Sequence, residues 1–113
     1  MKIVESRLSP VELKEMAGRV FGNMVKAVVD VDRSLLAVDA ELHSDLEALL
    51  LQDGSKQNYL WGINLYPEAA GADFVEFDSM INLRPSQENR SRGVESQDTR
   101  QKILKVVQTW VQS

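Results

Sequence analysis

Residues 24–42, MVKAVVDVDRSLLAVDAEL, decide the fold because they contain two β-rich runs around a single turn. The runs 24–31 and 35–42 are rich in valine and leucine, and residues 32–34, Asp-Arg-Ser, have the length and composition of a hairpin turn. Apolar and polar residues alternate along both runs, which is typical of strands with one face in the core. The stretch therefore predicts an antiparallel strand pair with one apolar and one polar face.

A second strand pair is predicted over residues 59–66 and 74–83. Residues 67–73, which join these runs, are rich in residues that interrupt regular structure, proline and glycine among them. Alternation in the last run places Phe74 and Met80 on the polar face. That face is also expected to carry the carboxylates of both strand pairs, namely Asp30, Asp39, Glu41, Glu76 and Asp78.

Three capping signals predict three helices. Residues 9–12, SPVE, form a capping box with proline at the first helical position and predict a helix over 10–21. Residues 44–47, SDLE, repeat the pattern and predict a helix over 45–53, and Ser96 caps a third helix. The order α-β-β-α-β-β-α predicts a single α+β domain over residues 1–113, with an antiparallel sheet of about four strands and helices on one face.

The composition excludes several classes of protein. The chain has no cysteine and one histidine, which excludes disulfides, thiolate metal sites and cysteine nucleophiles. Its net charge of −4 disfavours nucleic acid as a partner, because phosphate backbones attract basic surfaces. The sequence shows neither a secretory leader nor an apolar run of about 18 residues. We therefore expect a cytoplasmic protein that does not bind membranes.

Positive charge is concentrated late in the sequence. Residues 1–83 carry 7 Lys and Arg against 14 Asp and Glu, whereas residues 84–113 carry 6 against 3. Four arginines lie within the segment 84–100, in a polar loop before the third helix. Guanidinium groups, hydroxyls and amides near a helix N-terminus suit a phosphate or carboxylate. We predict an anion site formed by Asn82, Arg84, Ser86, Asn89, Arg90, Ser91 and Arg92. A loop held by its own salt bridges and a contact between subunits are the alternatives.

A candidate metal site lies where the run 35–42 leads into the next helix. Alternation puts Glu41 and His43 on one side of the chain, and Asp78 belongs to the same predicted polar face. Carboxylates and imidazoles bind divalent metals, and histidine titrates nearest to neutral pH. These three residues are therefore candidate ligands of a divalent cation. A packed or capping histidine beside a helix start is the alternative.

Several stretches resemble a family of small uncharacterised bacterial proteins catalogued as a domain of unknown function. They are residues 42–51 (LHSDLEALLL), 60–67 (LWGINLYP), 77–87 (FDSMINLRPSQ) and 89–94 (NRSRGV). The resemblance spans nearly the whole chain. It implies no activity, cofactor or catalytic residue.

Three functions are compatible with these observations. The leading hypothesis is a binding protein for a small phosphate- or carboxylate-bearing ligand, held by the segment 84–100. The second is a hydrolase of phosphate esters that uses a divalent cation. The third is an interaction module, expected to be a homodimer because Val28, Phe74 and Met80 on the polar face need cover. The sequence contains no nucleophile motif or metal motif that favours the hydrolase, so the binding protein is the leading hypothesis.

Overall fold

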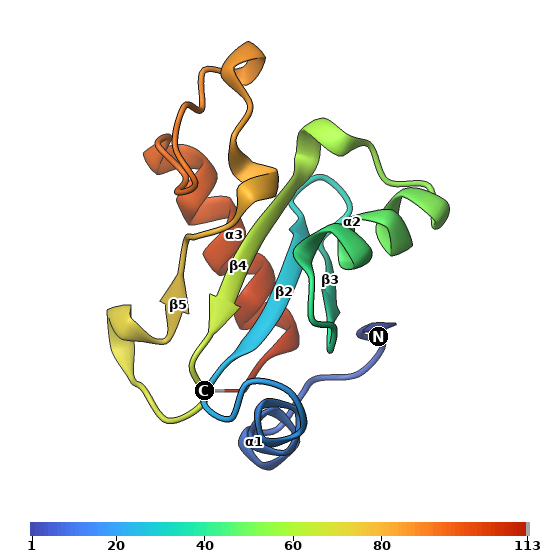
Figure 1. Ribbon diagram of the computed structural model, residues 1–113, viewed down its shortest axis with the longest axis vertical. Helices are drawn as coiled ribbons and strands as arrows, with labels where there is room; N and C mark the ends of the chain where they lie inside the picture. The colour runs from blue at the N-terminus through green and yellow to red at the C-terminus, as the bar shows by residue number, and fades with distance from the viewer. Residues whose placement is uncertain (113) are drawn as a thin grey trace.

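The computed structural model describes residues 1–112 and has an α+β fold, as predicted (Figure 1). Its antiparallel sheet has five strands in the order β1-β3-β2-β4-β5. The strands are β1 (Lys2–Ile3), β2 (Val25–Asp30), β3 (Leu35–Val38), β4 (Leu60–Leu65) and β5 (Val75–Glu76). The α-helices are α1 (Pro10–Arg19), α2 (His43–Gln52) and α3 (Gln97–Trp110). The strand β1 was not predicted from the sequence. Ser113 of the predicted domain lies outside the described residues.

Four short 3-10 helices occupy the connections between these elements. They are η1 (Gln57–Tyr59), η2 (Gly71–Asp73), η3 (Met80–Asn82) and η4 (Pro85–Gln87). Two of them, η3 and η4, lie within or just after the segment 74–83, for which one continuous strand is predicted. That prediction is wrong beyond β5, because the segment leaves the sheet after two paired residues.

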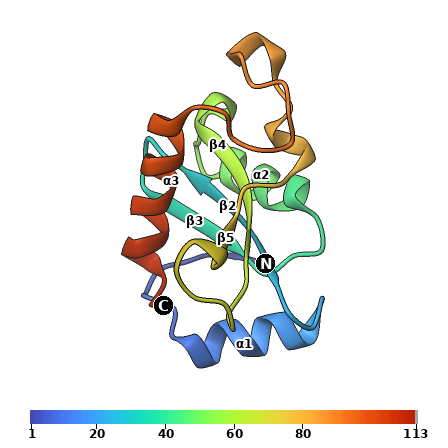
Figure 2. The ribbon, with the colours of Figure 1, turned by 90° about the vertical axis from the view of Figure 1, so that its left-hand side faces the viewer.

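Helices cover both faces of the sheet, so the prediction of helices on one face is wrong. One face includes Ala27 and Val29 of β2 and packs against α1 and α3. The opposite face includes Val28 and lies under α2. Figure 2 shows α3 and α2 on opposite sides of the strands. Four consecutive residues at the end of the central strand β2, Ala27 to Asp30, are therefore fully buried, which a strand with one solvent-exposed face does not allow.

The second covered face removes part of the basis for the predicted homodimer. Val28 lies under α2, and Phe74 packs into the core on the α3 face. Met80 on η3 remains 61% exposed. The face on which a second copy is expected is thus partly occupied by α2 and η3 of the same chain.

Local capping signals predict α1 and α3 correctly. Ser9 Oγ accepts the backbone N–H of Glu12 at 3.2 Å, and Glu12 Oε1 accepts that of Ser9 at 3.3 Å. Ser96 Oγ accepts the N–H of Thr99 at 3.2 Å at the start of α3. These hydrogen bonds join residues three apart, so they form wherever the surrounding chain allows a helix.

The capping box predicted for the middle helix is wrong. α2 begins at His43, with Leu42 as its N-cap and no side-chain capping bond. The chain bends after β3 at Asp39, which has a left-handed φ of 74°. Burial of His43 and Leu46 against the sheet then sets the start of the helix. Tertiary contacts override the local signal here.

The helices are short relative to a bilayer. The longest, α3, has 14 residues, whereas a membrane span needs about 20 apolar residues. Within residues 1–112, no helix has the length and apolar composition to cross a membrane.

Candidate functional site

The side-chain amide of Asn82 hydrogen-bonds to the backbone of β4 at an edge where no strand pairs with it. Its Oδ1 accepts the N–H of Gly62 at 2.8 Å, and its Nδ2 donates to the Gly62 carbonyl at 2.9 Å and to the Arg92 carbonyl at 3.0 Å. Asn82 is fully buried. Because β5 pairs only with the end of β4, the side-chain amide satisfies backbone groups that would otherwise be orphaned. Every polar group of this predicted ligand residue is used inside the chain.

Arg84 also hydrogen-bonds to backbone carbonyls, at the start of β4 and in the segment just before it. Its two terminal nitrogens donate to the carbonyls of Gln57 and Leu60, and the guanidinium stacks on the Trp61 ring, 4.2 Å from the centroid. Burial lowers the pKa of Arg84, and the carboxylate of Glu47 opposes this shift. The guanidinium fork faces protein carbonyls and aromatic carbon, so it is not directed at a ligand.

Asn89 holds the polar loop together. Its Nδ2 donates to the carbonyls of Asn82, Ser91 and Gly93 at 2.7, 3.1 and 2.8 Å. Its Oδ1 accepts the N–H of Glu95 at 2.9 Å. The side chain is 2% exposed. A loop that looks irregular in sequence is therefore built around one buried amide.

The remaining predicted ligand residues do not meet at one place. Arg92 Nε pairs with Asp78 Oδ1 at 2.7 Å. Ser86 and Arg90 are exposed, and Ser91 Oγ accepts a local N–H from Gly93 at 3.2 Å. The structure thus brings Arg84 and Arg92 to different partners. The segment 84–100 is therefore better described by the alternative, in which the loop is held by interactions within the chain.

The candidate metal residues do not gather into a metal-binding group. Glu41 is exposed after β3, whereas His43, the first residue of α2, is 7% exposed. Within residues 1–112, no three histidine, aspartate or glutamate side chains lie close enough together to hold a metal ion. Glu41, His43 and Asp78 therefore form no three-residue metal site, and nothing in this geometry favours a metal-dependent hydrolase over a binding protein.

His43 instead joins α2 to β4. Its Nε2 lies 2.8 Å from the Ile63 carbonyl, which can only accept, so Nε2 carries the proton. Burial lowers the pKa of His43, and the charge of Lys26 lowers it further. The Ile63 carbonyl, Asn64 and Asp78 oppose the shift. The packed histidine is the alternative that the structure supports.

A polar group that the site prediction omitted lies beside His43. Asn64 Nδ2 donates to Glu76 Oε1 at 2.8 Å, and the Tyr66 hydroxyl donates to the same oxygen at 3.0 Å. Partial burial and the Glu76 carboxylate raise the pKa of Tyr66. Asn64 and Glu76 are direct partners across β4 and β5, so alternation in the two runs was the signal that could have found them.

We expect the stability of the protein to fall as the pH drops below about 6.5, partly through His43. The folded-state pKa is lowered, so the unfolded chain binds a proton that the folded chain does not, and acid favours unfolding. His43→Gln keeps a donor for the Ile63 carbonyl and removes the titration. Its free energy of unfolding, measured in urea from pH 5.5 to 7.5, should have a shallower pH slope than that of the wild type. The chain has one histidine, so equal slopes would contradict the prediction.

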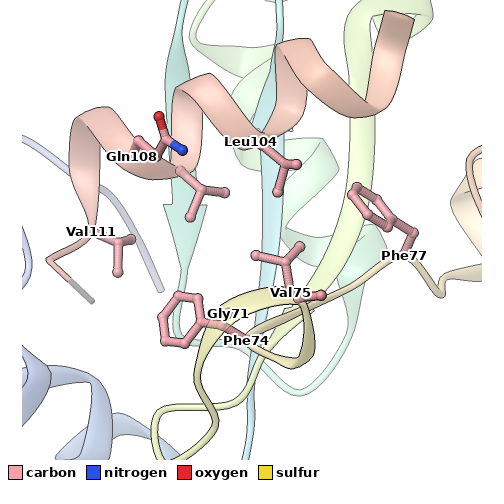
Figure 3. Close-up of a pocket in the computed structure, with 9 residues that line it drawn as sticks. Gly71, Phe74, Val75, Phe77, Leu104, Gln108 and Val111 are labelled. Carbon is pink, nitrogen blue, oxygen red and sulfur yellow. The ribbon is translucent and has the colours of Figure 1, made fainter. Parts of the chain in front are cut away.

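A cavity of about 450 Å³ lies between α3 and the η2–β5 segment. Figure 3 shows Leu104 of α3 and Val111, the residue just after this helix, facing Phe74, Val75 and Phe77 of the other wall. Val107, Gln108, Gly71 and Ala72 complete the lining, which contains no charged side chain. We call this cavity the α3–β5 pocket. This cavity was not predicted from the sequence.

A second cavity, of about 540 Å³, lies between the polar loop, the start of β4 and the first turns of α3. Of the predicted ligand residues, Asn89 lines it. Glu88 and Glu95 line it as well, together with Lys102, whose ammonium pairs with Asp98 at 3.2 Å. The two carboxylates repel an anion, so this cavity does not fit the predicted phosphate or carboxylate.

The fold and these cavities define a small α+β protein with ligand-sized pockets on the α3 side of its sheet. The chain belongs to the family described as "Protein of unknown function (DUF5674)", whose model matches residues 2–110. This assignment agrees with the resemblance to a domain of unknown function. No curated protein and no solved structure matches the chain.

Proposed function

We propose that this protein binds a small molecule whose apolar body occupies the α3–β5 pocket. The observation that carries the proposal is a cavity of about 450 Å³ with a mostly apolar lining. Ligand pockets typically measure about 300–1,000 Å³ and combine apolar walls with a few polar groups. Here the polar group is the side-chain amide of Gln108.

The energetics of burial support an apolar ligand. Each methylene removed from water contributes about 0.8 kcal/mol, which offsets the entropic cost of holding a small molecule. Phe74 and Val107 are buried and belong to the core cluster, so the walls exist before a ligand enters. Binding therefore needs little reorganisation of the chain. As in the leading hypothesis from the sequence, the protein is a binding protein for a small molecule. The proposed place of the ligand is different, because its apolar body lies against α3 and not in the polar loop.

Titration with octan-1-ol, a neutral apolar probe, tests the proposal by amide chemical shifts. We expect saturable shifts confined to residues 71–77 and 104–111. Gln108→Trp places an indole at the mouth of the pocket and should weaken binding at least tenfold. The exposed Gln108 side chain makes this change without disturbing the core.

Thr109→Trp is the matched control. Thr109 is exposed on the same helix but does not line the pocket, so this variant should bind the alcohol within about twofold of the wild type. Non-saturable shifts, or equal affinity of the two tryptophan variants, would refute the proposed site.

A further inference from the structure

Arg100 lies at the end of the α3–β5 pocket that is nearer to the N-terminus of α3. Its guanidinium carbon is 5.2 Å from the centroid of the Phe77 ring, and Phe77 lines the pocket. Its Nε donates to the Val94 carbonyl, which fixes the direction of the side chain. Leu104, one turn later on α3, also lines the pocket. Arg100 is not itself part of the lining, but its guanidinium packs against the ring of a residue that forms one wall of the cavity.

The charge of Arg100 is not neutralised by the protein. Arg19, Arg33 and Arg92 each pair with an aspartate, whereas no carboxylate among residues 1–112 lies within ion-pair distance of Arg100. In the same part of the chain, its two terminal nitrogens make no hydrogen bond. A guanidinium with both of these nitrogens free can bind a carboxylate through two parallel hydrogen bonds.

The surroundings of the pocket also favour negative charge at this end. Arg100 is in the first turns of α3, where the helix dipole is positive. At the other end of the helix, Arg7 donates to the backbone carbonyls of Gln108 and Val111, so that guanidinium is engaged. The two acidic residues within the lining segment, Asp73 and Glu76, are exposed and do not line the cavity.

We propose that the ligand is an amphipathic carboxylate, with its apolar body in the α3–β5 pocket and its carboxylate on the guanidinium of Arg100. This inference rests on the proposed function and adds the chemistry of the ligand's polar end. It also gives one arginine of the segment 84–100 a role in recognising an anion. Two other arginines of that segment, Arg84 and Arg92, bind groups of the same chain and serve its structure.

Three probes with the same eight-carbon chain test the inference by calorimetry: octanoate, octan-1-ol and octylammonium. The wild type should bind octanoate about tenfold more tightly than the alcohol, and the ammonium more weakly than either. Arg100→Gln should bind octanoate and octanol within about twofold of each other. Arg90→Gln, which removes an exposed arginine of the same loop, should keep the tenfold preference.

The outcomes separate the two proposals. If the wild type binds the alcohol as tightly as octanoate, the pocket stands and the carboxylate assignment is overturned. If Arg100→Gln also loses affinity for octanol, Arg100 shapes the cavity and does not recognise charge, which equally overturns the assignment. If no probe binds with saturation, both the proposed function and this inference are wrong.

Discussion

Replacing Asn82 with alanine should lower the free energy of unfolding by about 3–5 kcal/mol. The change removes three hydrogen bonds and leaves the N–H and the carbonyl of Gly62 without partners in a buried place. Each buried polar group that loses its partner costs about 1–3 kcal/mol. The carbonyl of Arg92 loses a donor as well. Chemical denaturation in urea, followed by circular dichroism, measures the change.

Asn23→Ala is the control for this prediction. Asn23 is exposed, so its substitution should change the free energy of unfolding by no more than about 0.5 kcal/mol. A loss below about 1.5 kcal/mol for Asn82→Ala would mean that other groups satisfy the edge of β4. The role assigned to Asn82 as a substitute for a strand would then be incorrect.

Replacing Gly62 with alanine should destabilise the protein by about 3 kcal/mol. A Cβ at this position would lie 2.5 Å from the Cβ of Ser79 and 3.1 Å from Cγ1 of Ile81. The Ser79 Cβ is attached directly to the backbone, so relief of the clash requires a shift of the chain. That shift would strain the hydrogen bond from the Ser79 N–H to the Arg92 carbonyl, which measures 2.9 Å. Overpacking of this kind typically costs about 1–3 kcal/mol.

A double-mutant cycle with Ser79→Gly tests whether this contact is the cause. Removing the Ser79 Cβ should recover part of the loss, so the two substitutions together should cost less than the sum of their separate effects. Gly18→Ala is the matched control, because no atom lies within 4 Å of the added Cβ and the position is helical. That variant should be more stable by about 0.5–1 kcal/mol. An additive cycle would show that the clash with Ser79 does not determine the loss.

Local signals account for the elements that the sequence analysis places well. The capping residues Ser9 and Ser96 act on N–H groups three residues away, so each signal is complete within one turn. The pairing of β2 with β3 follows from two adjacent runs and a short turn. The start of α2 depends instead on His43, whose partner Ile63 is twenty residues further along the chain.

The candidate site was harder to predict because arginine and asparagine side chains can bind either a ligand or the protein's own backbone. Arginine and asparagine in a polar loop suit an anion, yet the same groups suit unpaired backbone at a sheet edge. Arg84 and Asn82 serve the second purpose, since β5 ends after two residues and the start of β4 pairs with a strand only on its β2 side. The α3–β5 pocket was missed for a related reason. Leu104 and Val107 share one apolar stripe, and the stripe does not reveal which residues line a cavity.

The sequence by itself determined the α+β class, the β2–β3 hairpin, the helices α1 and α3, and the absence of cysteine chemistry. Each follows from composition or from contacts between residues close together in the chain. The tertiary structure alone decided that α2 covers the second face and that Asn82 pairs with Gly62. It also decided that Arg100 packs against Phe77, which lines a pocket. Those outcomes depend on contacts between residues that are far apart in the sequence, and such contacts are fixed only when the chain packs.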